Sequence, residues 1–585
     1  MRLSSLAGAL AGWVALHAAG QCLGALALDS TEGPASAGRL EWWRAARFGM
    51  FVHWGPVSLK GTEIGWSRGS EVPVAEYDSL YRQFNPTNFD AAAWAKLARE
   101  AGMKYVVFTT KHHDGFCMWD TKQTDYNIMQ SPFGRDVVKE LAAACRREGL
   151  AFGTYHSVTD WHHPDFPLTS PGGSVRRPVS DLDRYEHYLR AQVTELIVNY
   201  GPLLVMWFDV PQEFSVARGQ GLIDFTRGLQ PDILINNRSG AAGDFDTPEQ
   251  RVGAFQNQRP WETCMTLCQQ WAWKPNDTMK SLRECIAALV LCAGGDGNLL
   301  LNVGPMPDGR IEPRQAERLR EIGAWLDRYG ESVYATRGGP WKPTRTLAST
   351  RRGKTVFVHV LRREGDTVLL PKLPAKVVDN RLLTSGPAQS VANVTQREVK
   401  LVGNRVLTGG TAQVRPTETG IGITLPPAPA GAVESDLDTI VALEFDDSVM
   451  DLAPVSVPRP GAVKATASNV YQQMEEYAPD MAFDGDPSTR WATDAGTHQA
   501  WIAVDLGQAK RLAGVRIREA YAGRVRKFEF QRKDGADWQT VLAGTTLGAD
   551  FAGPFAPATA REWRLNILEA TEGPTISEIE LVEAK

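Results

Sequence analysis

The sequence predicts an α/β fold in which a (β/α)8-like barrel is followed by two β-sandwich domains. Two observations carry this prediction. Between residues 39 and 338, short apolar runs of strand type alternate with amphipathic helical patterns, which is typical of a parallel sheet covered by helices. After Gly338 the helical patterns stop, and short β-type runs separated by Gly, Pro and Asn continue to the end of the chain.

The elements of the barrel region follow from hydrophobic periodicity and from glycine stops after several helices. Strands are predicted at residues 48–54, 105–109, 151–155, 203–208 and 233–236, and helices at 89–101, 136–148, 182–200 and 313–329. The alternative is an open doubly wound sheet. No glycine-rich nucleotide loop follows the first strand, which disfavours that alternative.

The rest of the chain divides into two β-rich parts joined by a linker. Residues 340–447 are predicted to form the first sandwich, with strands at 355–360, 367–370, 399–402 and 422–425. Pro454, Pro458 and Pro460 mark a linker at 448–461. Residues 462–585 are predicted to form the second sandwich.

The N-terminus has the pattern of a signal peptide, which we place at residues 1–27. Arg2 precedes an apolar stretch at 3–16, and small residues around Ala27 suit signal-peptidase cleavage. We therefore expect export to the periplasm or the cell exterior; lipid attachment at Cys22 is the less favoured alternative. No later segment has the length and apolarity of a membrane span. A net charge of -5 disfavours nucleic acid as a partner.

The six cysteines after Cys22 show no CxxC spacing, so a cysteine metal site is not expected. Most are predicted to be buried thiols, and one disulfide is left open.

Polar side chains follow the apolar strands of the barrel region at the point where each strand ends. In a (β/α) barrel these ends converge on one face, where active sites are built. The residues concerned are His53, His112, His113, Asp114, Tyr155, His156, Asp209 and Arg238. A satisfied polar group at a strand end is the better interpretation of any one of them alone, but five strands with this feature indicate a polar pocket.

Such a pocket suits glycoside cleavage, which needs two carboxyl groups. Asp209, which ends a strongly apolar strand, is the candidate nucleophile. The second carboxyl stays open among Glu63, Glu213, Glu249 and Glu262. A metallohydrolase is disfavoured because adjacent histidines on a strand point to opposite faces.

Several motifs make the barrel region resemble the α-L-fucosidase family of glycoside hydrolases. The resemblance covers residues 40–334, in the family's order. It is carried by the segments 47–55, 111–116, 155–165, 207–209, 247–250, 261–266 and 297–305.

The resemblance implies an exo-acting enzyme that cleaves terminal α-L-fucose with retention, without a catalytic cofactor. By motif, Asp209 is the nucleophile and Glu249 the acid/base, with Glu262 second. The substrate-binding positions would be His53, Glu63, Trp66, His112, His113, Tyr155, Trp207, Arg238 and Glu262. Partners would be fucosylated oligosaccharides or glycoproteins, and segments 63–66 and 160–164 resemble the branch that prefers α-1,3/1,4-linked fucose. No catalytic metal is implied, and the oligomeric state is left open.

The tail resembles the discoidin-type (coagulation factor C-type) β-sandwich, on the segments 465–468, 482–491 and 501–507. That resemblance implies a carbohydrate-binding module, and a structural calcium ion is an open expectation. Two alternatives to a fucosidase remain at this point. One is an exported carbohydrate-binding or adhesion protein without turnover. The other is a retaining glycosidase for another 6-deoxy or galacto-configured sugar.

Overall fold

The computed structural model describes most of the chain from residue 36 onward. The described ranges are 36–170, 175–363, 365–374, 376–379, 394–397, 399–408, 412–425, 437–457, 463–474, 477–485 and 489–584. The predicted signal peptide, Cys22 and residues 458–461 of the predicted linker lie outside them.

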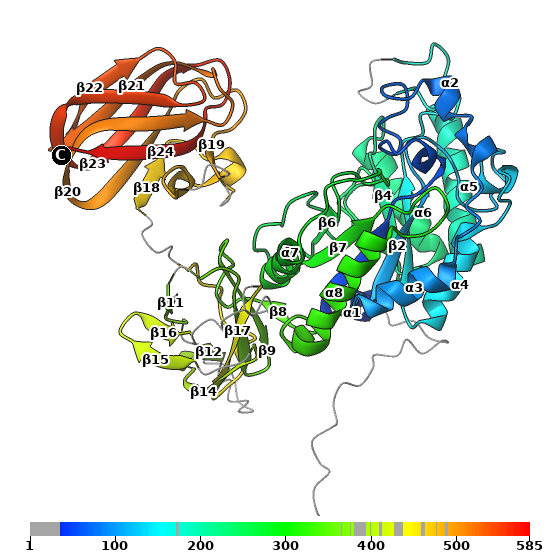
Figure 1. The fold of residues 1–585 in the computed structure, drawn as a ribbon, viewed down its shortest axis with the longest axis horizontal. Helices are drawn as coiled ribbons and strands as arrows, with labels where there is room; N and C mark the ends of the chain where they lie inside the picture. The colour runs from blue at the N-terminus through cyan, green and yellow to red at the C-terminus, as the bar shows by residue number, and fades with distance from the viewer. Residues whose placement is uncertain are drawn as a thin grey trace, which may run out of the picture.

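A parallel sheet forms the centre of the N-terminal region (Figure 1). Its strand order is β5-β4-β3-β2-β1-β7-β6, and every residue of these strands is buried, which explains their continuous apolar runs. The strands are β1 (Phe48–Val52), β2 (Tyr105–Lys111), β3 (Ala151–Ser157), β4 (Val205–Asp209), β5 (Leu234–Ile235), β6 (Glu262–Thr266) and β7 (Asn298–Val303).

An irregular segment fills the gap between the two edge strands. Asn236 bridges Phe245, Asp246 bridges Trp261 and Glu249 bridges Cys264, all in parallel fashion. Residues 245–249 therefore occupy the eighth strand position of the barrel, between β5 and β6, as an irregular segment. The predicted (β/α)8-like barrel is confirmed, with seven regular strands.

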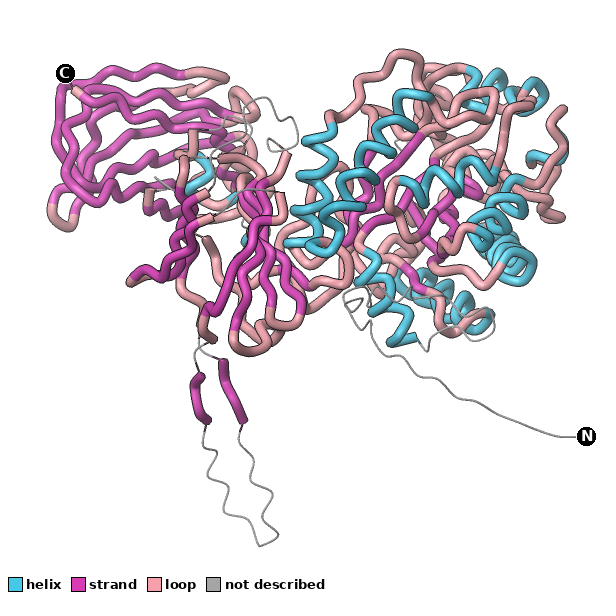
Figure 2. The backbone as a smooth tube through the Cα atoms, turned by 60° about the horizontal axis from the view of Figure 1, so that its bottom comes forward, coloured by secondary structure: helices cyan, strands magenta, loops and turns pink. Residues whose placement is uncertain are grey.

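Helices cover the outside of this barrel (Figure 2). They are α1 (Ser36–Ala46), the short α2 (Val74–Tyr77), α3 (Ala91–Glu100), α4 (Val137–Arg147), α5 (Leu182–Tyr200), α6 (Val216–Leu229), α7 (Leu282–Gly294) and α8 (Pro313–Tyr329). Side chains of Asp90, Asp136, Asp181, Ser215 and Ser281 cap five of them by accepting hydrogen bonds from backbone N–H groups.

The middle region is built from antiparallel strands. Five of them, β8 (Arg337–Gly338), β9 (Leu347–Arg352), β10 (Thr355–Val360), β14 (Leu401–Val406) and β17 (Thr439–Phe445), form one sheet. A second sheet holds β11 (Thr367–Pro371), β15 (Gln413–Thr417) and β16 (Gly420–Thr424), and β12 (Lys376–Asp379) pairs with β13 (Val394–Arg397).

Part of the predicted linker belongs to this middle region. Val449 and Leu452 are buried in its core, and the Val455 N–H donates to the carbonyl of Pro340. Placing the linker start at residue 448 was therefore wrong, because apolar side chains through Val457 pack against the sandwich.

The C-terminal region is a β-sandwich around Trp491 and Trp563, both fully buried (Figure 1). Its strands are β18 (Lys464–Ala467), β19 (Trp491–Ala492), β20 (Ala500–Glu519), β21 (Val525–Asp534), β22 (Asp537–Gly544), β23 (Phe551–Ala570) and β24 (Thr575–Glu583). An ion pair of 3.3 Å between Arg345 and Asp484 joins it to the middle region.

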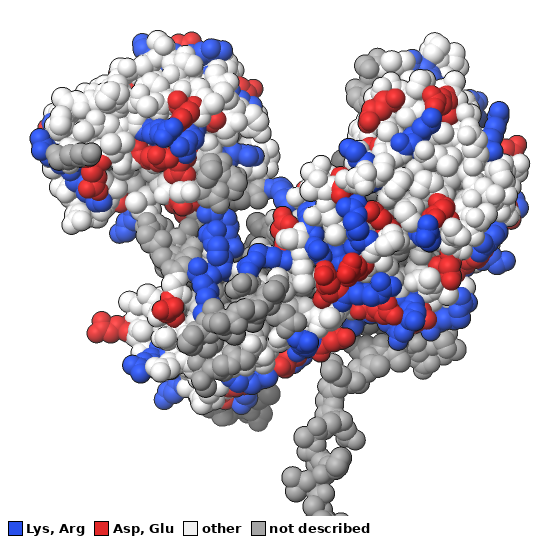
Figure 3. Space-filling view, in the orientation of Figure 1, with Lys and Arg blue, Asp and Glu red and all other residues white. Residues whose placement is uncertain are grey.

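Three predictions about the whole chain can be compared with the structure. All six cysteines in the described part are buried, free thiols, so no disulfide forms among them. No helix among the described residues has the length and apolarity to cross a membrane. Acidic and basic side chains are interspersed over the visible face of the barrel (Figure 3).

Candidate active site

The predicted polar residues meet at the carboxyl-terminal ends of the barrel strands. Asp209 is the last residue of β4, His53 follows β1, and His112 and His113 follow β2. Tyr155 lies on β3, and Arg238 follows β5. This is the face on which (β/α) barrels build their active sites.

Asp209 is held by three side chains. The Tyr155 hydroxyl donates to its Oδ2 at 2.8 Å, Arg238 Nη1 donates to its Oδ1 at 3.0 Å, and His113 Nε2 lies 3.7 Å from Oδ2. Burial would raise the pKa of this carboxyl, but the charge of Arg238 and the other two contacts outweigh it and lower the pKa. Asp209 is therefore ionised at neutral pH, as a nucleophile must be.

Arg238 also binds the second carboxylate. Its Nη1 lies 2.8 Å from Oε2 of Glu249, while Nε and Nη2 are fixed by Thr247. One nitrogen atom thus contacts both Asp209 and Glu249, and their two oxygens cannot be farther apart than the sum of 3.0 and 2.8 Å. These two oxygens are therefore close enough for a retaining pair, whose carboxyl groups lie roughly 5–5.5 Å apart.

The three histidines are buried and uncharged at neutral pH. Burial lowers the pKa of His53 to about 3, that of His113 to about 4, and that of His112 well below its usual value. His53 Nδ1 lies 2.7 Å from Oδ1 of Asn302, and His113 Nδ1 lies 2.7 Å from the Ser157 hydroxyl. Neutral imidazoles offer one donor and one acceptor each, which suits sugar hydroxyl groups.

Aromatic side chains form the floor and the rim of the pocket. The rings of Trp207 and Tyr155 stack 5.6 Å apart, and the Arg238 guanidinium lies 5.0 Å from the Trp207 ring centre. Trp66 is 40% exposed and lies edge-on to His113 and Trp161 at the rim. Both tryptophans therefore lie with the candidate catalytic residues.

Glu63 contacts the pocket through the backbone of a neighbouring loop. Its Oε2 accepts from the N–H of Trp271, and its Oε1 from the N–H groups of Ala272 and Ile64, at 2.9–3.1 Å. Burial raises its pKa despite these hydrogen bonds. Its visible role is to fix the loop that carries Trp271.

Glu262 does not reach this face. It is the first residue of β6, at the strand end opposite Thr266, and is 1% exposed. Its oxygens accept from the Tyr105 hydroxyl and, at 3.3 Å, from Nε1 of Trp207. The prediction that Glu262 contacts substrate or is the second-choice acid is wrong, because the barrel interior separates it from any leaving group.

Two residues of the site were not among the predicted candidates. The Trp271 ring lies 4.8 Å from the His53 ring and 5.9 Å from that of Phe51, and Asn302 connects His53 to the carbonyl oxygen of Trp271. Asn302 lies within the segment 297–305 named above, whereas Trp271 lies on the loop that follows the segment 261–266.

The residue after Asp209 has a strained backbone. Val210 has a φ of 44°, a region that β-branched residues rarely occupy. The Thr159 hydroxyl donates to its carbonyl oxygen at 2.5 Å, and the Val158 N–H donates to that of Asp209 at 2.9 Å. These contacts hold the turn that points Asp209 into the pocket.

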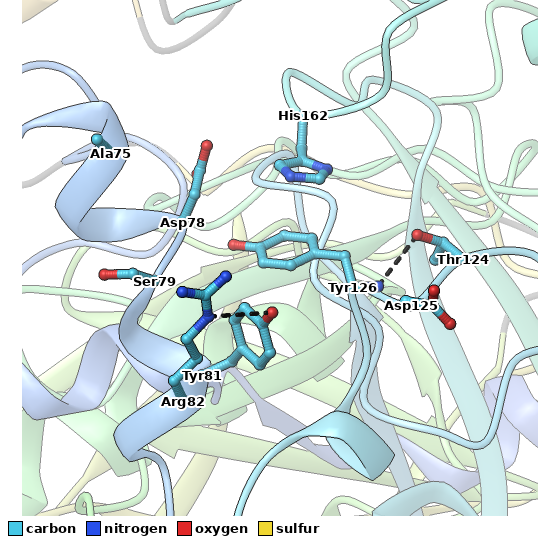
Figure 4. A pocket seen from close by; sticks show the side chains of 9 residues that line it. All are labelled: Ala75, Asp78, Ser79, Tyr81, Arg82, Thr124, Asp125, Tyr126 and His162. Carbon is cyan, nitrogen blue, oxygen red and sulfur yellow. Dashed lines mark hydrogen bonds between the residues drawn. The ribbon is translucent and has the colours of Figure 1, made fainter.

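A second cavity, of about 550 Å³, is lined by segments that neighbour the rim (Figure 4). Its lining residues are Ala75, Asp78, Ser79, Tyr81, Arg82, Thr124, Asp125, Tyr126 and His162. The His162 ring stacks on Tyr126 at 4.0 Å, and Tyr81 meets Tyr126 edge-on at 5.5 Å. His162 directly follows Trp161, which contacts Trp66, so the cavity and the pocket share one loop.

Comparison with known proteins identifies two regions of the chain. The family model described as alpha-L-fucosidase matches residues 30–331, and the F5/8 type C domain model matches residues 464–581. Tissue alpha-L-fucosidase of Mus musculus is 30% identical over 54% of this chain and 74% of its own.

Solved structures agree with these matches. An alpha-L-fucosidase isoenzyme 1 from Paenibacillus thiaminolyticus has a TM-score of 0.60 and 32% identity, over 70% of this chain and 100% of its own. A trapped covalent intermediate of an alpha-L-fucosidase from Bacteroides thetaiotaomicron, in complex with 2-fluoro-fucosyl fluoride, has a TM-score of 0.59 and 26% identity, over 71% and 98%.

Proposed function

The chain belongs to the alpha-L-fucosidase family and is a retaining glycoside hydrolase, and we propose that Asp209 is its nucleophile and Glu249 its acid/base. The observation that carries the proposal is the single Arg238 nitrogen that contacts both carboxylates on the catalytic face of the barrel.

The proposed reaction is a double displacement. A carboxylate oxygen of Asp209 attacks the anomeric carbon of terminal α-L-fucose, the glycosidic C–O bond breaks, and the leaving oxygen takes a proton from Glu249. A water molecule then gives a proton to Glu249, and the oxygen of that water displaces Asp209 from the anomeric carbon. Enzymes of the family act without a cofactor. Within the described ranges, no group of three or more His, Cys, Asp or Glu residues is arranged to hold a metal ion.

Glu249 has to change partners during this cycle. A carboxyl group that is about to donate its proton does not keep an ionic contact, so we expect Glu249 to leave Arg238 when substrate binds. The Glu249 side chain is 40% exposed and lies on the irregular segment 245–249 between β5 and β6. It can therefore turn toward the leaving oxygen without displacing a core side chain.

The pocket around Asp209 supports recognition of a 6-deoxy sugar. The neutral imidazoles of His53, His112 and His113 suit ring hydroxyl groups, and the rings of Trp271 and Phe51 give an apolar surface for a methyl group. Comparing an aryl α-L-fucoside with the corresponding α-L-galactoside, which adds a hydroxyl to that methyl group, tests this assignment against another galacto-configured substrate.

For linkage we propose α-1,3/1,4-linked fucose on branched glycans. The support is the second cavity, which is lined by the rings of Tyr81 and His162 and by the carboxylates of Asp78 and Asp125. Aromatic faces next to polar groups suit a saccharide, and a branched glycan has a further sugar to place there. The decisive experiment is release of fucose by the purified protein from α-1,2-, α-1,3-, α-1,4- and α-1,6-fucosylated oligosaccharides. Preference for the α-1,2 or α-1,6 compound would refute the proposal.

For the C-terminal sandwich we propose carbohydrate binding. The Arg490 guanidinium lies 5.2 Å from the ring centre of Tyr477 and 5.8 Å from that of Tyr521, which is 50% exposed. Exposed aromatic rings beside guanidinium donors are suited to sugars. Binding of the isolated oligosaccharides to an Asp209→Gly variant, measured with and without Tyr521→Ala, tests this role.

A structural calcium ion in this sandwich remains part of the proposal. Oε2 of Glu578 is buried without a hydrogen-bond partner, and burial and the neighbouring Asp484 raise the Glu578 pKa to about 7. Carboxylate oxygens are the ligands that a hard cation such as calcium prefers. A melting temperature that is the same in calcium and in chelator would refute it.

We also propose that the protein is exported, on the basis of its N-terminal sequence alone. Mass spectrometry of the mature protein checks this: the expected N-terminus is at or near residue 28.

A further inference from the structure

Glu262 lies beneath the active site without reaching it. Its carboxylate accepts hydrogen bonds from the Tyr105 hydroxyl and from Nε1 of Trp207, and no cation pairs with it among the described residues. Burial raises its pKa to about 7, and the hydrogen bonds only partly offset that effect. A buried carboxyl group without a cation is costly, and the proposed reaction does not use it.

Its contact with Trp207 connects it to the catalytic groups. The Trp207 indole donates to Glu262 with its N–H, while its ring stacks on Tyr155 and lies under the guanidinium of Arg238. Tyr155 and Arg238 are the two side chains that donate hydrogen bonds to Asp209. Rotation of the indole would therefore remove the ring surface against which both donors of the nucleophile pack.

We propose that Glu262 is a positioning residue, which fixes the orientation of Trp207 and through it the donors that hold Asp209. The inference rests on the proposed role of Asp209. Indole N–H groups buried in a core need an acceptor, and the Glu262 carboxylate is the acceptor that Trp207 has. Because productive geometry tolerates only small displacements, losing this acceptor lowers turnover while the site residues stay in place.

The experiment compares Glu262→Leu, which removes the acceptor, with Glu262→Gln, which keeps a carbonyl oxygen for Trp207. We expect Glu262→Leu to lower kcat at least tenfold with KM changed less than threefold. We expect Glu262→Gln to recover most of that loss. The loss is the same for aryl fucosides with good and poor leaving groups, since the proton donor is untouched. Tyr105→Phe is the matched control: it removes another hydrogen-bond donor to Glu262 while Trp207 keeps its acceptor, so we expect a lower melting temperature and a kcat within twofold of the wild type.

A double-mutant cycle with Trp207→Phe gives the direct test. Phenylalanine keeps a ring under Arg238 but has no N–H, so Glu262→Leu should cost less than twofold in that background. A tenfold cost in both backgrounds overturns the inference, because Glu262 then acts by another route. If Glu262→Leu does not fold, the kcat of Trp207→Phe is the test of the inference. A wild-type kcat in that variant overturns the inference. Loss of activity in Asp209→Gly tests the nucleophile separately, so the two failures are distinguishable.

Discussion

Nη1 of Arg238 lies 3.0 Å from Oδ1 of Asp209, at the carboxyl-terminal end of β4. The same nitrogen lies 2.8 Å from Oε2 of Glu249, so one cation neutralises both carboxylates of the unliganded site. The contact with Arg238 suits the proposed role of Asp209, because a nucleophile has to stay ionised. It does not suit the proposed role of Glu249, which has to leave Arg238 to act as an acid.

Asp209→Gly is expected to lower turnover of an aryl fucoside by on the order of 10³-fold or more, because the covalent intermediate cannot form. Azide at high concentration should restore part of the activity, since a small anion can occupy the space of the carboxylate and attack the anomeric carbon. The product would be a fucosyl azide of inverted configuration, identified by NMR. A folded variant with near wild-type turnover would refute the assignment.

Glu249→Gln is expected to slow substrates with poor leaving groups by roughly 10²–10⁴-fold and activated aryl fucosides far less, because only the former need a proton donor. Glu262→Gln is the matched control, and any loss it causes should be equal for both substrate types. Steady-state rates over a series of aryl leaving groups make the comparison. The reverse pattern would refute the assignment of Glu249 as the acid/base.

The sequence predicted the barrel and most of its pocket because strand ends converge by topology. Asp209 and Arg238 could be placed from the strands that precede them, since each follows an apolar run. The place of Glu262 could not be predicted, because no strand was predicted at residues 262–266 and the sequence therefore did not show that Glu262 begins one. Glu249 lies on the irregular segment 245–249 and follows no regular strand, so only the family resemblance identified it.

The buried histidines predict a loss of stability in acid. The folded pKa is about 3 for His53 and about 4 for His113, both below the value of roughly 6.5 in an unfolded chain. Below pH 6.5 the unfolded state therefore binds more protons, and the free energy of unfolding falls as the pH drops toward 4. Each unit of pKa difference is worth about 1.4 kcal/mol.

Melting temperatures between pH 7 and pH 4 measure this effect. His113→Gln should show a smaller decrease over that range than the wild type, because one of the proton-excluding groups is gone. His187→Gln, at an exposed position on α5, should keep the wild-type decrease. Equal decreases in all three proteins would show that His113 does not contribute to the acid sensitivity.

Tyr81→Ala is expected to lower kcat/KM on a branched α-1,3/1,4-fucosylated oligosaccharide at least fivefold and to leave an aryl fucoside within twofold. The reason is that only the branched substrate is large enough to reach the second cavity. Tyr329→Ala, a half-buried tyrosine at the end of α8, serves as the control and should affect neither substrate selectively. Equal effects of Tyr81→Ala on both substrates would separate the cavity from substrate binding.

Removing the C-terminal sandwich separates a binding role from a structural one, and the position of the cut matters. A chain ending at Asp451 loses Leu452 and the Val455 contact with Pro340, so it should melt at a lower temperature than a chain ending at Val457. The chain ending at Val457 keeps that core, and we expect it to hydrolyse a small aryl fucoside at nearly the wild-type rate. On fucosylated glycoproteins it should be slower, because a sugar-binding tether raises the local substrate concentration without changing the transition state.

If the glycoprotein rate is unchanged and the melting temperature falls, the sandwich stabilises the enzyme through contacts such as that of Asp484 with Arg345. Arg345→Ala in the full chain distinguishes the two cases again, since it breaks this ion pair while the sugar-binding loops stay attached.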